Sequence, residues 1–299
     1  MSADIMLRHG RLEVLLDSRL GGCCTALKYD SRDAAEVVDI LRPFPDGSTD
    51  PFEAACFAML PFSNRLFDGR LQMPGGPGLI LPPNCDRIEV PVHGVGWMSA
   101  WTIASLSSHE VVMGLSHTPN DHWPFRMDCT QRISVTGNSV RFHASICNTG
   151  VTSMPAGLGF HPRFNLGPMA RVTLGAGTVW LQDQRGYPAQ CVAVQGAGRD
   201  GSLADGPALR MAMNHCFADW SGRAVLDLPE RKLAVHLSAS ANLRHLMVYR
   251  LSGKPWLCVE PVSHATGAFS LEMMRSPVHG ARLLEPGESL SGWMDLEVL

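Results

Sequence analysis

The stretch Val140-Arg141-Phe142-His143-Ala144-Ser145-Ile146 alternates apolar and polar side chains residue by residue. Successive side chains of a β-strand point to opposite faces, so the four apolar residues of this stretch share one face. This pattern is typical of an antiparallel strand with one face in a hydrophobic core and the other toward solvent. The stretch therefore predicts a sheet whose apolar face must be buried.

Short runs rich in Val, Ile, Leu and Phe recur along the rest of the chain, punctuated by 29 glycines and 21 prolines. No stretch of comparable length has helical spacing. Many short strands without intervening helices favour two packed antiparallel sheets or a barrel over a parallel α/β fold. The predicted fold class is all-β. Strands are expected at Arg11–Leu16, Arg87–Val92, Trp101–Leu106, Glu110–Leu115, Arg132–Val135, Ser139–Cys147, Leu233–Leu237 and Leu246–Arg250.

The chain has 299 residues, a length that suggests one or two domains. The glycine-rich stretches at 74–78 and 196–201 are typical of surface loops, and neither is long enough to link two domains. No internal repeat of fixed period and no low-complexity tract is visible. We therefore expect a single domain over residues 1–299.

Charge and hydropathy argue against several classes of partner. A formal net charge of −3 provides no broad cationic field for a phosphate backbone, so nucleic acid is not expected as a partner. No apolar run reaches the roughly 18 residues of a membrane helix, and the first 16 residues lack a signal-peptide core. We expect a cytoplasmic protein, with no membrane partner, that acts on a small neutral molecule.

The nine cysteines are scattered, and the adjacent pair Cys23-Cys24 lacks the spacing of a zinc knuckle. Free cysteine commonly packs as a small hydrophobic residue. Reduced and mostly buried thiols are therefore expected.

Four short clusters combine titratable side chains with prolines or glycines that fix the backbone, as functional loops on a rigid β scaffold commonly do. Taken singly, Arg65 is commonly a surface residue and His93 a structural histidine. Glu260 follows an apolar run, so burial at a strand end could raise its pKa and suit it to acid or base chemistry. The clusters are 60–66, 93–97, 159–166 and 258–262.

Taken together and in this order, the clusters resemble the aldose 1-epimerase family, also called the galactose mutarotases. The resemblance covers about residues 10 to 298 and implies a large antiparallel β-sandwich of the galactose mutarotase type. That agrees with the fold class predicted from the strand pattern. It rests on Gly21-Gly22, Asn64-Arg65, His93-Gly94 with Trp97, the motif around His161 from Gly159 to Leu166, and Glu260-Pro261.

The resemblance implies interconversion of the α and β anomers of a free aldose by opening and closing of the hemiacetal ring. A base removes the proton of the C1 hydroxyl while an acid protonates the ring oxygen, and the roles reverse on closure. The implied base is Glu260 and the implied acid is His161. No metal ion and no organic cofactor is expected. The implied sugar-binding residues are Arg65, His93, Asn64, Asn214 and Trp97.

Two positions depart from the family pattern. Asn214 stands where a sugar-binding aspartate is usual, so a different sugar preference is expected. Asp219 is an alternative replacement, although its odd offset along a strand directs it to the opposite face. Arg163 stands where a tyrosine is common, and we expect it to face outward or to add an anion contact.

Two alternatives use the same fold. A hexose-6-phosphate 1-epimerase would need arginines that converge on the phosphate, for which Arg65, Arg126 and Arg163 are the candidates. A non-catalytic sugar-binding module would use tryptophans as stacking platforms. Its candidates are Trp97, Trp101, Trp123 and Trp220.

A glycoside hydrolase would need two carboxylates about 5 to 10 Å apart, and the sequence offers one well-placed carboxylate. The sequence leaves open which sugar is used, whether it is phosphorylated, and whether the protein is a monomer or a homodimer.

Overall fold

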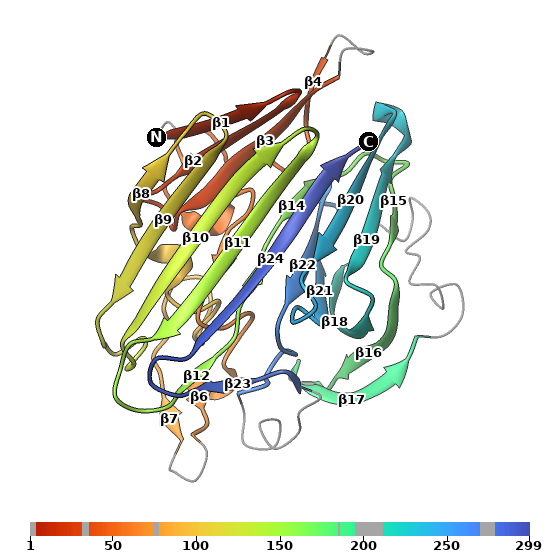
Figure 1. Cartoon of the computed structure of the whole chain (residues 1–299). Helices are drawn as coiled ribbons and strands as arrows, with labels where there is room; N and C mark the ends of the chain where they lie inside the picture. The colour runs from red at the N-terminus through yellow and green to blue at the C-terminus, as the bar shows by residue number, and fades with distance from the viewer. Residues whose placement is uncertain (1–3, 32–35, 74–77, 185, 195–211, 270–278) are drawn as a thin grey trace.

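The computed structural model describes residues 4–31, 36–73, 78–184, 186–194, 212–269 and 279–299. Two large antiparallel sheets dominate it (Figure 1). The first has eight strands, in the order β15 (Arg171–Thr173), β19 (Arg223–Leu228), β20 (Leu233–Ala239), β24 (Ser289–Val298), β11 (Ser139–Asn148), β10 (Met127–Thr136), β9 (Glu110–His117) and β8 (Thr102–Leu106).

The second large sheet carries the candidate site. Its order is β17 (Pro188–Ala193), β16 (Ala176–Gln182), β18 (Met213–Trp220), β21 (His245–Arg250), β22 (Trp256–Val262), β13 (Gly159–Phe160) and β5 (Ala58–Met59), and β14 (Arg163–Asn165) also pairs with β22.

Smaller elements complete the described part of the chain. A four-stranded sheet contains β1 (Ile5–His9), β2 (Leu12–Asp17), β3 (Cys23–Ser31) and β4 (Glu36–Asp39). Two-stranded ribbons pair β12 (Met154–Ala156) with β23 (Arg282–Leu284) and β6 (Arg70–Leu71) with β7 (Leu79–Ile80). Short 3-10 turns lie at Pro51–Glu53, Phe67–Gly69, Gly96–Met98 and Pro229–Arg231.

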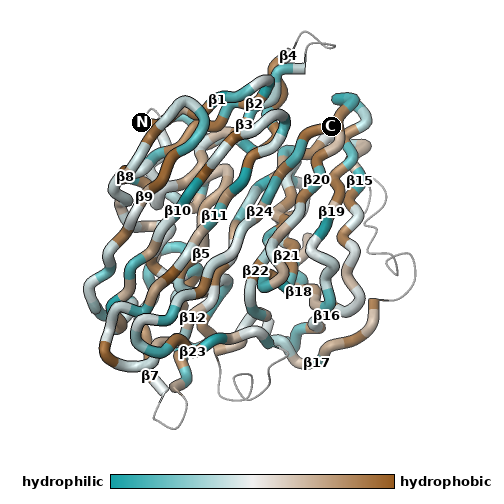
Figure 2. Tube along the Cα trace, viewed as in Figure 1, coloured by the Kyte–Doolittle hydropathy of each residue, from teal (hydrophilic) through white to brown (hydrophobic). Residues whose placement is uncertain are grey.

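The all-β prediction is confirmed, and the stretch that suggested it forms β11. On β11 the burial alternates, and Phe142 faces Ile133 of β10 across the sheet. Figure 2 shows the matching alternation of hydrophobic and hydrophilic residues along β10 and β11. One core cluster contains Phe142 of the first sheet together with Val248 and Val259 of the second, so the sheets bury their facing sides against each other.

The expected strand at Arg87–Val92 is wrong, whereas each of the other expected windows overlaps a strand. Pro91 has no backbone N–H to contribute to a ladder. The N–H of Val92 instead donates to the side chain of Asn84, at 2.9 Å, and Val92 forms only an isolated bridge with Arg65. The stretches 74–77 and 196–201, expected to be loops, lie outside the described residues, and the single domain stays a prediction.

Six of the nine cysteines are buried and all nine are free thiols, as expected. The exposed one is Cys191, and Cys85 and Cys147 are half-buried. In the described part of the chain, we find no helix with the length and hydrophobicity that a membrane crossing requires.

Candidate functional site

The candidate site lies on the face of the second sheet that points away from the core. Along β22, Leu257 and Val259 belong to the core, so Cys258 and Glu260 between and beyond them point to the opposite face. Glu260 faces Met247 of the neighbouring β21. Strand alternation therefore places the Glu260 carboxylate on the face of the sheet opposite the core, where the residue is nevertheless buried.

A row of residues crosses the same face two residues away from the Glu260–Met247 pair along each strand. Asn214 of β18 faces Tyr249 of β21, Tyr249 faces Cys258, and Cys258 faces Arg163 of β14. Asn214 is exposed, whereas Cys258 and Arg163 are buried. The row therefore runs from an exposed amide to a buried arginine.

His161 lies at the junction between β13 and β14. Its backbone N–H donates to the carbonyl of Phe57, at 2.9 Å, and its ring stacks on the Phe57 ring with centroids 4.6 Å apart. Its Nε2 lies 3.2 Å from Oε1 of Glu260, and only 4% and 2% of these two residues is exposed. The two residues implied to transfer protons are thus in direct, buried contact.

Asn64 and His93 hold each other in an unusual backbone conformation. Both have positive φ, 58° and 57°, a region that non-glycine residues seldom adopt. The N–H of His93 donates to the carbonyl of Asn64, at 2.9 Å, and the N–H of Asn64 donates to Nδ1 of His93, at 3.2 Å. Because Nδ1 accepts this hydrogen bond, it carries no proton, and the single ring proton of neutral His93 lies on Nε2.

The surroundings of Gly94 explain why a glycine follows His93. A Cβ at position 94 would lie 2.1 Å from the carbonyl oxygen of Leu60, and the residue has a φ of 71°. The contact leaves no room for a Cβ, and the positive φ favours glycine. Isolated bridges between Leu60 and Gly94 and between Arg65 and Val92 join the segments at 60–65 and 92–96.

Asn84 fastens the backbone on both sides of His93. Its Nδ2 donates to the carbonyls of Val92 and Gly94, at 2.8 and 2.7 Å, while its Oδ1 accepts from Val92. Asn84 is 6% exposed, so these bonds are shielded from water. It is a positioning residue that sequence analysis missed. Its place after Pro82-Pro83, typical of a turn, was the available signal.

Trp97 was expected to contact the sugar, but it packs edge-on against the His93 ring, with centroids 6.2 Å apart, and does not line the cavity. It is 1% exposed, stacks on Phe57 at 5.5 Å, and donates from Nε1 to the carbonyls of Val92 and Gly94. Its contacts support the His93 segment, and the indole does not line the cavity.

The charges of the site are set mainly by burial. Burial raises the pKa of Glu260 to about 8, and the positive charge of Arg163 only partly opposes this rise. Burial also lowers the pKa of His161 well below its ordinary value, with Arg163 and His93 contributing, and lowers that of His93 to about 3. At neutral pH the Glu260–His161 pair therefore holds one proton, and His93 is neutral.

A cavity brings six of the seven predicted site residues together: Asn64, Arg65, His93, His161, Asn214 and Glu260. Arg65 is exposed at this cavity, and no ion pair engages its side chain within the described residues. Sequence analysis missed the remaining lining residues. Met247 and Tyr249 could have been found from their period-two spacing on one strand. The missed lining residues are Phe52, Ile88, Val92, Met247 and Tyr249.

Arg163 was expected to face outward or to contact an anion, and the outward placement is wrong. It is 6% exposed, with its guanidinium over the Trp256 ring at 5.5 Å and Nη1 4.0 Å from Glu53. It does not line the cavity. Its charge nevertheless acts on the site, because it opposes protonation of both His93 and His161.

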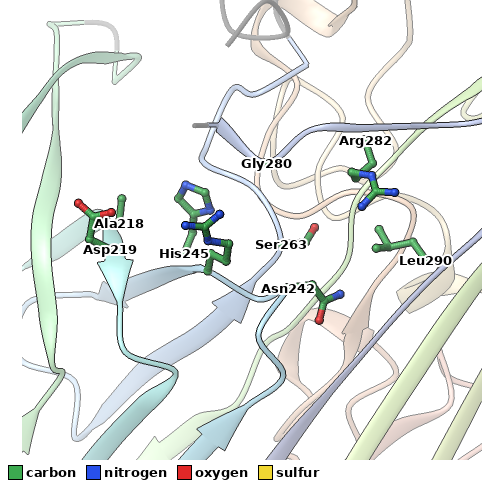
Figure 3. A pocket seen from close by; sticks show the side chains of 9 residues that line it. Ala218, Asp219, Asn242, His245, Ser263, Gly280, Arg282 and Leu290 are labelled. Carbon is green, nitrogen blue, oxygen red and sulfur yellow. The ribbon is translucent and has the colours of Figure 1, made fainter. Parts of the chain in front are cut away.

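A second cavity lies toward the other end of β18 and β21, and Figure 3 shows some of its lining, including Asp219, His245 and Arg282. Asp219 lines this second cavity, where it accepts a hydrogen bond from the hydroxyl of Thr178 at 3.2 Å. It is absent from the lining of the candidate site. Of the two proposed replacements for the family aspartate, only Asn214 therefore lies at that site.

Three potential metal ligands meet beside the cavity, although their sequence spacing gave no sign of it. Ligand atoms of His161, Cys258 and Glu260 all lie within 4.8 Å of one another, and all three residues are buried. An imidazole, a carboxylate and a thiol thus lie within reach of one another.

The chain matches known proteins over nearly its whole length. Residues 4–297 match the family described as Aldose 1-epimerase. The uncharacterized protein YphB of Escherichia coli K12 is 25% identical over 289 residues, covering 91% of this chain and 96% of that protein.

Solved structures show the same fold. A crystal structure from Escherichia coli K12, described as a candidate aldose 1-epimerase, has a TM-score of 0.86 at 24% identity and covers 98% of both chains. A galactose mutarotase-like protein from Clostridium acetobutylicum has a TM-score of 0.82 at 20% identity, covering 98% of this chain and 94% of that one. With the family match extending from residue 4 to residue 297, the chain belongs to the aldose 1-epimerase family.

Proposed function

We propose that this protein is an aldose 1-epimerase that interconverts the α and β anomers of a free aldose. The observation that carries the proposal is the buried contact between His161 Nε2 and Glu260 Oε1, 3.2 Å apart on the wall of the cavity. Family membership supports the same class of reaction.

The proton count of the pair suits this reaction. Ring opening starts with ionised Glu260 and protonated His161, and it ends with neutral Glu260 and neutral His161. Both states hold one proton in total, which is the content that the pKa values give near neutral pH. Glu260 takes the proton of the C1 hydroxyl, His161 gives its proton to the ring oxygen, and closure on the other face reverses both transfers.

The neighbouring side chains offer hydrogen-bond donors and acceptors that can bind a sugar. The Nε2–H of neutral His93 is a donor, and Asn214 and Asn64 offer amide groups that donate and accept. Arg65 at the cavity can donate to sugar hydroxyls or to the ring oxygen. Since both oxygens bonded to C1 lie close together, an acid and a base in contact can reach both from one side.

The geometry favours this proposal over the alternatives. Of the three arginines considered for a phosphate, only Arg65 lines the cavity. Arg163 is buried, and neither Arg163 nor Arg126 is in the lining. Glu260 is the sole carboxylate among the described lining residues, where a glycoside hydrolase needs two. The tryptophans considered as stacking platforms are all buried: Trp97, Trp101, Trp123 and Trp220.

Anomer-resolved NMR on fresh α-glucose, α-galactose and their 6-phosphates tests the proposal. We expect acceleration of anomer exchange for at least one free sugar, and a smaller acceleration for its 6-phosphate. No acceleration on any free sugar contradicts the proposed activity. A preference for the phosphorylated substrate would favour the hexose-6-phosphate alternative.

A further inference from the structure

Cys258 is the one member of the buried cluster that the proposed reaction does not use. It is two residues before Glu260 on β22, so both side chains leave the same face of the strand. Its Sγ lies within 4.8 Å of the ligand atoms of His161 and Glu260. It is absent from the cavity lining, and neither proton transfer needs it.

A thiol, an imidazole and a carboxylate are the three ligand types that Zn²⁺ takes in proteins, at roughly 2.0 to 2.3 Å. A tetrahedral ion with such bonds holds its ligand atoms about 3.3 to 3.6 Å apart. His161 Nε2 and Glu260 Oε1 are already 3.2 Å apart, so they need little adjustment. From the 4.8 Å limit, the Cys258 sulfur would have to approach the other two ligand atoms by up to about 1.2 Å to reach a spacing of about 3.6 Å.

We propose that Cys258, Glu260 and His161 form a binding site for a thiophilic divalent cation such as Zn²⁺, and that its occupancy reversibly inhibits the enzyme. On binding, the Cys258 thiol and the Glu260–His161 pair each release one proton to solvent, and the thiolate sulfur, the carboxylate and the imidazole bond the metal with no change of oxidation state. Three protein ligands leave a fourth position of a tetrahedral ion, which water or a sugar hydroxyl would complete.

Inhibition follows because the metal engages the lone pairs that must exchange protons. With Nε2 of His161 and the Glu260 carboxylate bound to a cation, neither group can take or give a proton. The inhibitory effect rests on the proposed function, whereas metal binding itself does not.

Two features make the site reversible. Arg163 faces Cys258 across the β14–β22 ladder, and its positive charge opposes a dication. Metal-bound histidines usually donate from the second ring nitrogen to an acceptor, but Nδ1 of His161 has no hydrogen-bond partner in the described structure. We therefore expect a dissociable inhibitor rather than a structural ion.

The test compares Cys258→Ser with Cys216→Ser, a matched control on the same face of β18. Cys216 is also buried and lies opposite Met247, outside the ligand cluster. EDTA-stripped proteins are titrated with Zn²⁺ by calorimetry and with Co²⁺ by absorption, since thiolate ligation gives a near-ultraviolet charge-transfer band. Anomer exchange is measured with and without Zn²⁺.

We expect saturating Zn²⁺ to slow the wild type at least tenfold, and EDTA to restore it. Cys258→Ser should keep its basal rate, lose the charge-transfer band, and bind Zn²⁺ at least tenfold more weakly, while Cys216→Ser behaves as wild type. Unchanged Zn²⁺ affinity in Cys258→Ser, or a wild type without the cobalt band, overturns the site. Tight Zn²⁺ binding that leaves the rate unchanged overturns the inhibition. Absence of activity in the stripped wild type counts against the proposed function, while the binding arms still decide the site.

Discussion

Replacing Glu260 by glutamine should make the protein more stable at alkaline pH and far less active. Burial raises the pKa of this carboxyl from an ordinary value of 4.5 to about 8. Below pH 4.5 the carboxyl is neutral in both the folded and the unfolded chain, so burial of a charge costs nothing. Between these values the unfolded chain ionises first, and the free energy of unfolding of the wild type falls as the pH rises.

The size of the effect follows from the difference between the two pKa values. About 3.5 pKa units at 1.36 kcal/mol each correspond to a penalty of up to about 5 kcal/mol, complete above pH 8. Glutamine keeps the shape and a hydrogen bond to His161 but cannot ionise. The Glu260→Gln variant should therefore lack the pH-dependent loss, while kcat falls by about 10² to 10⁴ because the base is absent.

Urea unfolding of both proteins at pH 5, 7 and 9 measures the stability difference, and anomer-resolved NMR measures kcat. Glu297→Gln is the control, because Glu297 is exposed on β24 and keeps its hydration on folding. The reasoning fails if the gain of Glu260→Gln is the same at pH 5 and pH 9, since Glu260 would then not be held as a neutral acid. Full activity of the folded variant would remove Glu260 from the mechanism.

Four further predictions concern the same site. His161→Asn should lower kcat by about 10² to 10⁴ with thermal unfolding unchanged, and a fully active folded variant contradicts its role as acid. In the wild type, kcat/KM should fall as pH rises through about 8, where the Glu260–His161 pair loses its single proton. It should also fall as pH drops well below 6.5, where His161 adds a second proton to the pair. A rate that only rises from pH 6 to 10, after subtraction of uncatalysed exchange, would refute the one-proton pair. Asn84→Asp should raise KM about tenfold with kcat nearly unchanged, because it loosens the segment that carries His93, and an equal loss in kcat would argue for a role beyond positioning. Asn214→Asp should change the ratio of kcat/KM among galactose, glucose and a third aldose, with kcat within about tenfold, and unchanged ratios would show that Asn214 does not contact the sugar.

The sequence was sufficient for the fold class because the deciding property is local. Alternation along β11 directs Phe142 inward whatever the partner strand is, and similar alternation recurs on other strands. The same rule misled at Arg87–Val92, where the alternation was real but Pro91 removed a ladder donor and Asn84 supplied a side-chain acceptor to Val92. A strand requires a partner as well as a pattern, and the pattern does not name the partner.

The site was less predictable, because its chemistry depends on residues that meet across strands. Arginine is usually exposed, yet register places Arg163 beside Cys258, Trp256 lies under its guanidinium, and the buried charge then acts on the site histidines. The family pattern suggested His161 and Glu260 as acid and base without indicating that they touch. Their contact bears directly on the proposed reaction, because two buried groups 3.2 Å apart cannot both carry an extra proton or both lack one at little cost. Burial therefore does more than shift each pKa: it favours a pair that holds one proton near neutral pH. In the proposed ring opening and closure one member of the pair gains a proton while the other loses one, so this total of one proton is preserved.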